Sequence, residues 1–206
     1  MRKISSPALT AAGLLVGAVL LAACASSGGG SAYGSGDPSL TAANPGGGPL
    51  DPFLTDGHAV LRALDAIGSR AGKPLRVLSL DADRMNGLHV DVQEPANHAN
   101  VDRYVVAPNG DLSGPAPVKM MSLDGKPITA ASVDAQAFDA GAIGFARLTQ
   151  TAREAIAKSG FPDARVSEWE INGLGPDARR YIFLDAARGR PVAVVNPNLT
   201  IVQMRF

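Results

Sequence analysis

Two patterns of hydrophobic and polar residues alternate along most of the chain, one with the period of a helix and one with the period of a strand. The first helical pattern runs from Val60 to Ala71, where apolar residues recur at spacings of four, three and four. These spacings predict one buried face of a helix. Thr55 or Asp56 stands before this run as a potential N-cap and Gly72 follows it, so both ends of the helix are marked.

A second helix is predicted over residues 142–159, before the stop signal of Gly160 and Pro162. The residues that would share one face of it are Phe145, Leu148, Ala152, Ile156 and Ser159. Each helix therefore has a single face to bury, which requires a second layer of structure beneath it.

Short apolar runs rich in β-branched residues lie between turn signals and predict strands. Asn109-Gly110 is one such signal, of the hairpin type. The expected class is α+β, with antiparallel sheets on which the amphipathic helices lie. The predicted strands are 75–82, 88–92, 101–107 and 118–123 after the first helix, and 165–171, 179–185, 191–196 and 199–206 after the second.

The order of elements occurs twice, because each helix is followed by about four strands. Arg76-Val77 in the first half matches Arg165-Val166 in the second, and Arg103-Tyr104 matches Arg180-Tyr181. These matches predict a duplicated α+β unit. Chance similarity between two ordinary helix-plus-sheet segments is the alternative interpretation.

The two predicted units, residues 53–130 and 131–206, resemble tandem PepSY-like units and the two-unit fold of beta-lactamase inhibitor protein. In both families a helix packs on an antiparallel sheet, and the resemblance here rests on the matched segments within about residues 56–206. It implies that the body binds or inhibits a protein partner and catalyses nothing. The stabilising disulfides of the inhibitor family cannot form, since the chain has one cysteine.

Residues 1–23 have the layout of a secretory signal, with a basic start followed by an uncharged apolar run. The junction Leu21-Ala22-Ala23-Cys24 resembles the lipobox of bacterial lipoprotein precursors. This resemblance implies cleavage between Ala23 and Cys24, transfer of a diacylglyceryl group to the Cys24 thiol, and a fatty acid such as palmitate on the freed amine.

Two or three acyl chains on Cys24 would hold the protein on a bilayer, because each buried methylene contributes about 0.8 kcal/mol. Ala25 follows the cysteine in place of an aspartate. In a Gram-negative host this implies an outer-membrane location facing the periplasm. A plain cleaved signal peptide and an uncleaved signal-anchor helix are the alternatives.

Residues 24–52 are dominated by Gly, Ser and Pro and predict a flexible linker between the lipid and the body. The whole chain has 19 basic and 19 acidic residues. A formal net charge of zero is not typical of a nucleic-acid-binding protein. With no polybasic run present, attachment to the membrane would rest on the lipid on Cys24 rather than on charge.

The chain offers few residues for catalysis or metal binding. His89 and His98 lie near Asp81, Asp83 and Asp91 in the sequence, but the segment from Asp81 lacks the glycine and the bidentate glutamate of a calcium loop. No G-x-S-x-G motif is present. We therefore predict no catalytic residue, no metal and no cofactor, and hence a protein that is not an enzyme.

Trp169, Tyr104 and Tyr181 are the candidate partner contacts, because amphipathic aromatic residues often anchor interfaces. Their alternative role is in the core, since aromatic residues make up only 5% of the chain. Glu168 and Glu170 flank Trp169 and predict a solvated strand face opposite to it.

The predicted function is that of a lipid-anchored cell-envelope protein that binds a protein or another envelope component without catalysis. Two alternatives stay open: an accessory factor of an envelope assembly machine, and a hydrolase or small-ligand-binding protein with an unrecognised site. A deep pocket holding two or more of His89, His98, Asp81 and Asp91 would favour the last of these.

Overall fold

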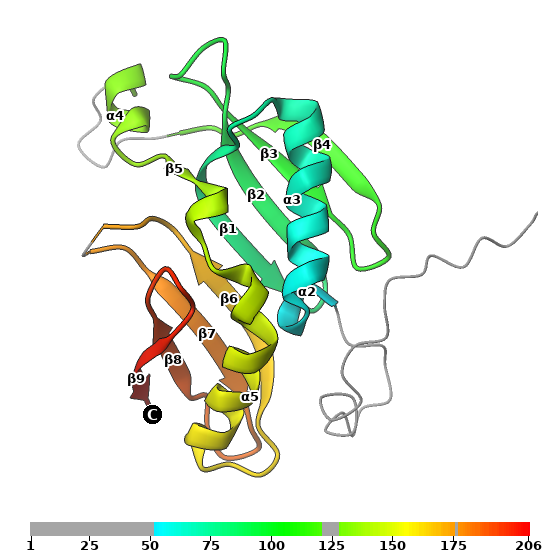
Figure 1. Cartoon of the computed structure of the whole chain (residues 1–206), viewed down its shortest axis with the longest axis vertical. Coiled ribbons are helices and arrows are strands. Elements are labelled where there is room, and N and C mark those ends of the chain that lie inside the picture. Colours follow the sequence, from blue (N-terminus) through cyan, green and yellow to red (C-terminus); the bar gives the residue numbers. More distant parts are fainter. Residues whose placement is uncertain (1–51, 121–127, 176) are drawn as a thin grey trace, which may run out of the picture. The chain divides into compact units, whose positions relative to one another are not determined.

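The computed structural model describes residues 52–120, 128–175 and 177–206. In these ranges nine strands form one sheet, in which every pair of neighbours is antiparallel. Two long helices pack on one face of this sheet (Figure 1). The predicted α+β class is confirmed.

The first predicted helix is confirmed, together with both of its end signals. The side chain of Asp56 caps the helix by accepting a 2.9 Å hydrogen bond from the backbone N–H of His58. Gly72 ends it with a φ of 106°, which glycine adopts without steric penalty. The elements of the first half are α2 (Pro52–Thr55), α3 (Gly57–Ala71), β1 (Arg76–Asp83), β2 (Gly87–Gln93), β3 (Val101–Val106) and β4 (Leu112–Pro117).

The fourth strand of the first half differs from the prediction. Residues 118–120, the described part of the expected strand 118–123, are not in a strand, and β4 lies just before them. Gly114, Pro115 and Pro117 hide β4 in the sequence, because glycine and proline indicate a turn. Prolines are tolerated because β4 is the outermost strand, where one row of backbone N–H groups has no partner.

The second long helix begins at Leu148, six residues after the predicted start at 142. Ile143 is extended and the Gly144 N–H donates to the Pro197 carbonyl oxygen, so this backbone cannot join the helical hydrogen bonds. Gly160 ends the helix, as predicted, and it does so in the left-handed conformation. The elements from the connection to this helix are α4 (Ala130–Asp134), β5 (Phe138–Asp139), the 3-10 turns η1 (Ala140–Ala142) and η2 (Phe145–Arg147), and α5 (Leu148–Ser159).

Four strands follow α5, and each agrees with its predicted range to within two residues at either end. They are β6 (Arg165–Ile171), β7 (Arg180–Asp185), β8 (Val192–Val195) and β9 (Ile201–Arg205). The strand order across the sheet is β4-β3-β2-β1-β6-β7-β8-β9, with β5 pairing β1 outside this series. Because β1 pairs with β6, the two halves share one continuous sheet instead of each having its own.

Of the two sequence matches between the halves, the first joins equivalent strands of the structure and the second does not. Arg76 and Arg165 are the first residues of β1 and β6. Arg103-Tyr104, however, lies in the third strand of its half and Arg180-Tyr181 in the second strand of its own, so this match is wrong. A duplication with units 53–130 and 131–206 stays a prediction.

One hydrophobic cluster fills the space between the helices and the sheet and draws on both halves. Trp169, Phe53 and Phe145 are its largest fully buried side chains. The Trp169 indole donates a 2.7 Å hydrogen bond to the Phe53 carbonyl oxygen, and its ring centre is 5.4 Å from that of Phe145. These contacts of Trp169 therefore pack α2 and η2 against β6. Among the described residues, no helix is both long and apolar enough to span a bilayer.

Candidate functional site

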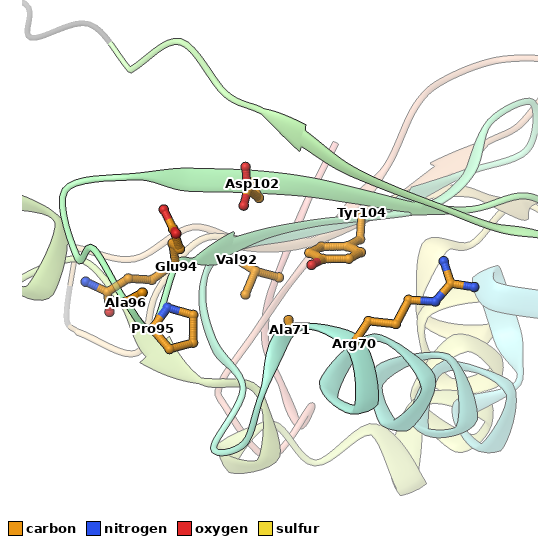
Figure 2. A pocket seen from close by; sticks show the side chains of 9 residues that line it. Arg70, Ala71, Val92, Glu94, Pro95, Ala96, Asp102 and Tyr104 are labelled. Carbon is orange, nitrogen blue, oxygen red and sulfur yellow. The ribbon is translucent and has the colours of Figure 1, made fainter. Parts of the chain in front are cut away.

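A cavity of about 330 Å³ opens beside the C-terminal end of α3 (Figure 2). Its walls come from the last turn of α3, from β2 and β3, and from the loop that joins these two strands. A volume of this size accommodates a side chain or a small molecule. Its lining includes the apolar residues Ala71, Val92 and Pro95 and the polar residues Glu94, Asp102 and Tyr104.

The alternation of β3 explains how Asp102 and Tyr104 both come to line the cavity. They are two residues apart, so they project from the same side of the strand. In the pairing of β2 with β3, Asp102 lies opposite Val92 and Tyr104 lies opposite Val90, which belongs to the core. Because α3 ends at Ala71, the helix leaves space in front of these inward positions.

Tyr104 is almost enclosed but has an unused polar group. The residue is 4% exposed, and its phenol end points into the cavity (Figure 2). No hydrogen bond of this phenol is present among the residues that the structure describes. Burial raises the pKa of Tyr104, Asp102 raises it further and Arg70 partly offsets both. The phenol is therefore neutral at physiological pH and free to donate or accept a hydrogen bond.

The charged groups around the cavity give it a negative electrostatic potential. Glu94 and Asp102 contribute two carboxylates, and that of Glu94 accepts a 2.7 Å hydrogen bond from the Asn100 amide. The C-terminal end of α3 adds the partial negative charge of its last carbonyl groups. Arg70 is the cation of this wall, but its Nη1 donates to the Leu112 carbonyl oxygen at 3.2 Å. Its guanidinium group extends away from the phenol (Figure 2).

A polar network holds the loop at the back of the cavity. Gln93 is 2% exposed, and its amide donates to Asp134 Oδ1 at 2.8 Å and to the His98 carbonyl oxygen at 3.1 Å. Its Oε1 accepts from Arg76 Nε at 3.0 Å, and Asp134 Oδ1 lies 2.9 Å from His98 Nδ1. The Gln93 hydrogen bond, with a further contribution from His98, lowers the pKa of Asp134. The network joins the loop to β1 and α4, so the cavity wall is built on rigid elements.

The histidines and aspartates considered as metal ligands are spread over the fold. On the face of the sheet away from the helices, His89 Nδ1 lies 3.4 Å from Asp81 Oδ2, and Asp91 pairs with Arg103 at 2.7 Å. His98 belongs to the network behind the cavity. Across the described residues, no three His, Cys, Asp or Glu side chains are arranged to hold a metal ion.

Two pairs of carboxylates face each other at the centre of the helix-free face, Asp81 with Glu170 and Asp83 with Glu168. Like charges that are directly opposite in a sheet repel one another. Burial raises the pKa of Asp81, against the effect of His89. Burial also raises the pKa of Glu168, and the neighbouring carboxylates Asp83 and Glu170 raise it further.

Asp83 has a structural role in the turn between β1 and β2. Its Oδ1 accepts hydrogen bonds from the backbone N–H groups of Met85 at 2.7 Å and Asn86 at 2.9 Å. Burial alone would raise the pKa of Asp83, but these bonds and those from the Asn86 amide outweigh it and lower the pKa. This carboxylate is thus committed to the turn.

The three aromatic residues predicted as partner contacts have different positions. Trp169 is 1% exposed and enclosed by the core, so its assignment as a contact is corrected: its role is the core role that the sequence allowed as the alternative. Tyr104 is buried except for its access to the cavity. Tyr181 is half-buried on the helix-free face, 5.9 Å from the Phe183 ring and 5.6 Å from the Arg205 guanidinium carbon.

Sequence reasoning did not select Glu94 or Asp102 as site residues. A local signal exists for Asp102, because it occupies an inward position on a strand whose other inward residues, Tyr104 and Val106, belong to the core. Glu94 has no such signal. It reaches the cavity only because the loop after β2 is held by distant residues of β1 and α4.

Ala23 and Cys24, the predicted cleavage and lipidation residues, lie outside the described residues, as do the signal segment 1–23 and the linker up to position 51. Their roles stay predictions. Phe53, in α2, is fully buried in the core. The described fold therefore begins where the predicted linker ends.

No protein-family model matches the chain, and no curated protein matches it. A crystal structure of a protein from Clostridium difficile 630, provisionally described as a lipoprotein, has a similar fold, with a TM-score of 0.52 and 17% sequence identity. The similarity covers 74% of this chain and 93% of that chain. At this identity the comparison establishes a shared fold and says nothing about the cavity residues.

Proposed function

We propose that this chain is a lipid-anchored protein of the cell envelope that binds another envelope component, a protein or a smaller molecule, without catalysing a reaction. The lipobox-like junction at Cys24 and the Gly/Ser/Pro-rich segment after it support the anchor and the tether. The provisional description of the structural neighbour as a lipoprotein supports the same assignment. In a Gram-negative host the location is the outer membrane, facing the periplasm.

The observation that carries the binding role is the Tyr104 phenol, which faces an open cavity and has no hydrogen bond to any described residue. The phenol oxygen is accessible to solvent through the cavity. A ligand that displaces water there can hydrogen-bond the phenol and approach the carboxylates of Asp102 and Glu94, which line the same cavity. A phenylalanine at this position would keep the packing of the ring but would offer no such hydrogen bond.

The two alternatives differ in their support. A hydrolase would need several of its polar residues in one pocket, but His98 lines a cavity of about 190 Å³ behind the loop while His89 and Asp81 pair on the opposite face of the sheet. An accessory factor of an assembly machine could use the same binding site. Deletion of the gene distinguishes it, because the loss of an accessory factor disturbs envelope integrity.

The anchor is tested by the intact mass of the protein recovered from cells, wild type against Cys24→Ser. We expect the wild-type mass to lack residues 1–23 and to gain acyl chains on Cys24, with the protein in the membrane fraction. The serine variant has no thiol to accept the lipid and should remain unmodified. A mature wild-type chain with a free thiol, recovered without detergent, would contradict the proposal.

The binding role is tested by photo-crosslinking in intact cells. A photoreactive amino acid at Ala96, which is exposed on the cavity rim, should form an adduct whose identity mass spectrometry can determine. The same amino acid at Arg188, exposed between β7 and β8, is the matched control and should form none. An absence of adducts at 96, or the same adducts at both positions, would count against binding at this cavity.

A further inference from the structure

We infer that the cavity beside Tyr104 binds an organic cation, an ammonium group carried on a short apolar stem such as that of a lysine side chain. This inference rests on the proposed binding function and specifies the chemistry of the ligand. It is carried by one cavity that brings together a phenol without a hydrogen bond to any described residue, two carboxylates and an apolar surface.

The polar lining matches the donors of an ammonium group. Such a group has three N–H donors and no acceptor. The cavity offers the carboxylates of Asp102 and Glu94, and the phenol oxygen of Tyr104 as an acceptor that no described residue uses. Asp102 has no hydrogen bond from its side chain among the described residues, whereas Glu94 already accepts one from Asn100. Asp102 is therefore the principal counter-ion.

The apolar lining matches the stem. Ala71, Val92 and Pro95 form a surface along which methylene groups can lie while the charged end reaches the polar groups. The Tyr104 ring adds an aromatic face, which attracts a cation held over it. At about 330 Å³ the cavity is near the lower limit of ligand pockets, so it suits a side chain better than an extended peptide.

The neighbouring cations do not convert the cavity into an anion site. Arg70 donates to the Leu112 carbonyl oxygen and extends away from the phenol. Lys73, just beyond the end of α3, pairs with Asp65 at 2.9 Å. A phosphate or carboxylate ligand would approach Glu94 and Asp102 with its own negative charge, and like charges repel.

The test uses the full protein purified from cells in detergent, with its tyrosine rings labelled for NMR. The chain has three tyrosines, and the signal of Tyr104 is assigned by its absence in Tyr104→Phe. The probes are lysine blocked at both backbone ends, norleucine blocked in the same way, and n-butylammonium. We expect both amines to shift the Tyr104 signal saturably and norleucine to leave it unchanged. Tyr181, on the other face, should not move with any probe.

Two acid-to-amide variants complete the test. Asp102→Asn should weaken binding of the blocked lysine at least about tenfold, which is about 1.4 kcal/mol, because it removes the charge that pairs with the ammonium group. Asp111→Asn removes an exposed carboxylate of the turn between β3 and β4 and should leave the affinity unchanged. An unchanged Tyr181 signal in Asp102→Asn shows that the variant has kept its fold.

The outcomes separate the ligand class from the binding function. Tighter binding of the blocked lysine than of n-butylammonium indicates a lysine side chain as the natural ligand, and the reverse indicates a small free amine. Equal shifts by lysine and norleucine would overturn the inference, because the charge would then play no part. If no amine binds while the crosslinker at Ala96 still captures a component, the ligand class is wrong and the binding function stands. If crosslinking fails as well, both are wrong.

Discussion

Asp81 and Glu170 lie directly opposite each other where β1 pairs with β6, at the centre of the sheet. Each acid is the sixth residue of its strand, counted from Arg76 in β1 and from Arg165 in β6. The antiparallel register of the two strands places these two positions opposite each other. An acid therefore lies opposite an acid.

Glu170→Gln should stabilise the protein by about 0.5 kcal/mol at neutral pH, because it removes one of two opposed charges. The glutamine oxygen can still accept the hydrogen bond that Asn172 donates to Glu170 at 3.1 Å. Urea unfolding, followed by the fluorescence of the single tryptophan, measures the change. Glu154→Gln on α5 changes the net charge equally and is the control. A Glu170→Gln variant no more stable than that control would contradict the prediction.

The two acids with raised pKa values should make the folded state less stable as the pH rises. In the unfolded chain the pKa values of Asp81 and Glu168 are about 4. Burial raises the pKa of each in the folded protein. Between the unfolded and the folded pKa the folded state binds more protons, so the contribution of these groups falls with increasing pH. Asp83 acts in the opposite sense, because its folded pKa is lowered and its contribution is lost as the pH falls through that value.

The double variant Asp81→Asn, Glu168→Gln tests this sign. Its free energy of unfolding should decline less between about pH 4 and about pH 7 than that of the wild type. Asp83→Asn should instead lose stability at neutral pH, where the ionised Asp83 accepts the hydrogen bonds of the turn. Urea midpoints at several pH values measure both effects. Parallel curves for the double variant and the wild type would show that the pKa values are not raised.

Tyr104→Phe should leave the fold as stable as the wild type or slightly more stable. The phenol has no hydrogen bond to lose among the described residues, and the ring keeps its place in the core. Thermal unfolding measures the difference, with Tyr181→Phe as the control on the helix-free face. A loss of more than about 1 kcal/mol would reveal a structural partner for the phenol and would weaken the argument for a ligand.

Trp169→Phe should destabilise the protein by about 1–3 kcal/mol, because it leaves the buried Phe53 carbonyl oxygen without its 2.7 Å hydrogen bond and empties part of the core. Circular dichroism in urea replaces fluorescence, since the variant contains no tryptophan. Phe183→Leu shortens a half-buried aromatic residue outside this contact and should cost less. The opposite ranking would show that the hydrogen bond between β6 and α2 matters little.

A pair of glycine variants separates backbone strain from steric clash. Gly160 has a φ of 73° and open space around a built Cβ, so Gly160→Ala should cost about 1–2 kcal/mol for the left-handed backbone. Gly87 has a similar φ of 83°, but its Cβ would lie 2.2 Å from the Val106 carbonyl oxygen. Gly87→Ala should therefore cost clearly more, as measured by urea unfolding. Equal costs would mean that the β2–β3 hairpin relaxes around the methyl group.

Much of the fold can be predicted from short stretches of the chain because the responsible interactions are local. Helix α3 is specified by its own residues: the Asp56 cap marks its start, the spacing of apolar residues marks its buried face, and Gly72 marks its end. Strand β6 is likewise specified locally, by the alternation of buried and less buried residues along it. Prediction fails where a local signal has two meanings, as with Pro115 and Pro117, which indicate a turn but belong to an edge strand.

The cavity and the sheet that carries it depend on contacts between residues far apart in the sequence. Ala82 opposes Trp169, and the Gln93 amide reaches Asp134, although no local pattern marks either pair. Hydrophobic period specifies which face of a strand is buried, but not which strand lies beside it or where a helix stops covering the sheet. The predicted lipid anchor comes from a short run of consecutive residues ending at Cys24. The cavity, in contrast, forms only when chain segments far apart in the sequence pack together.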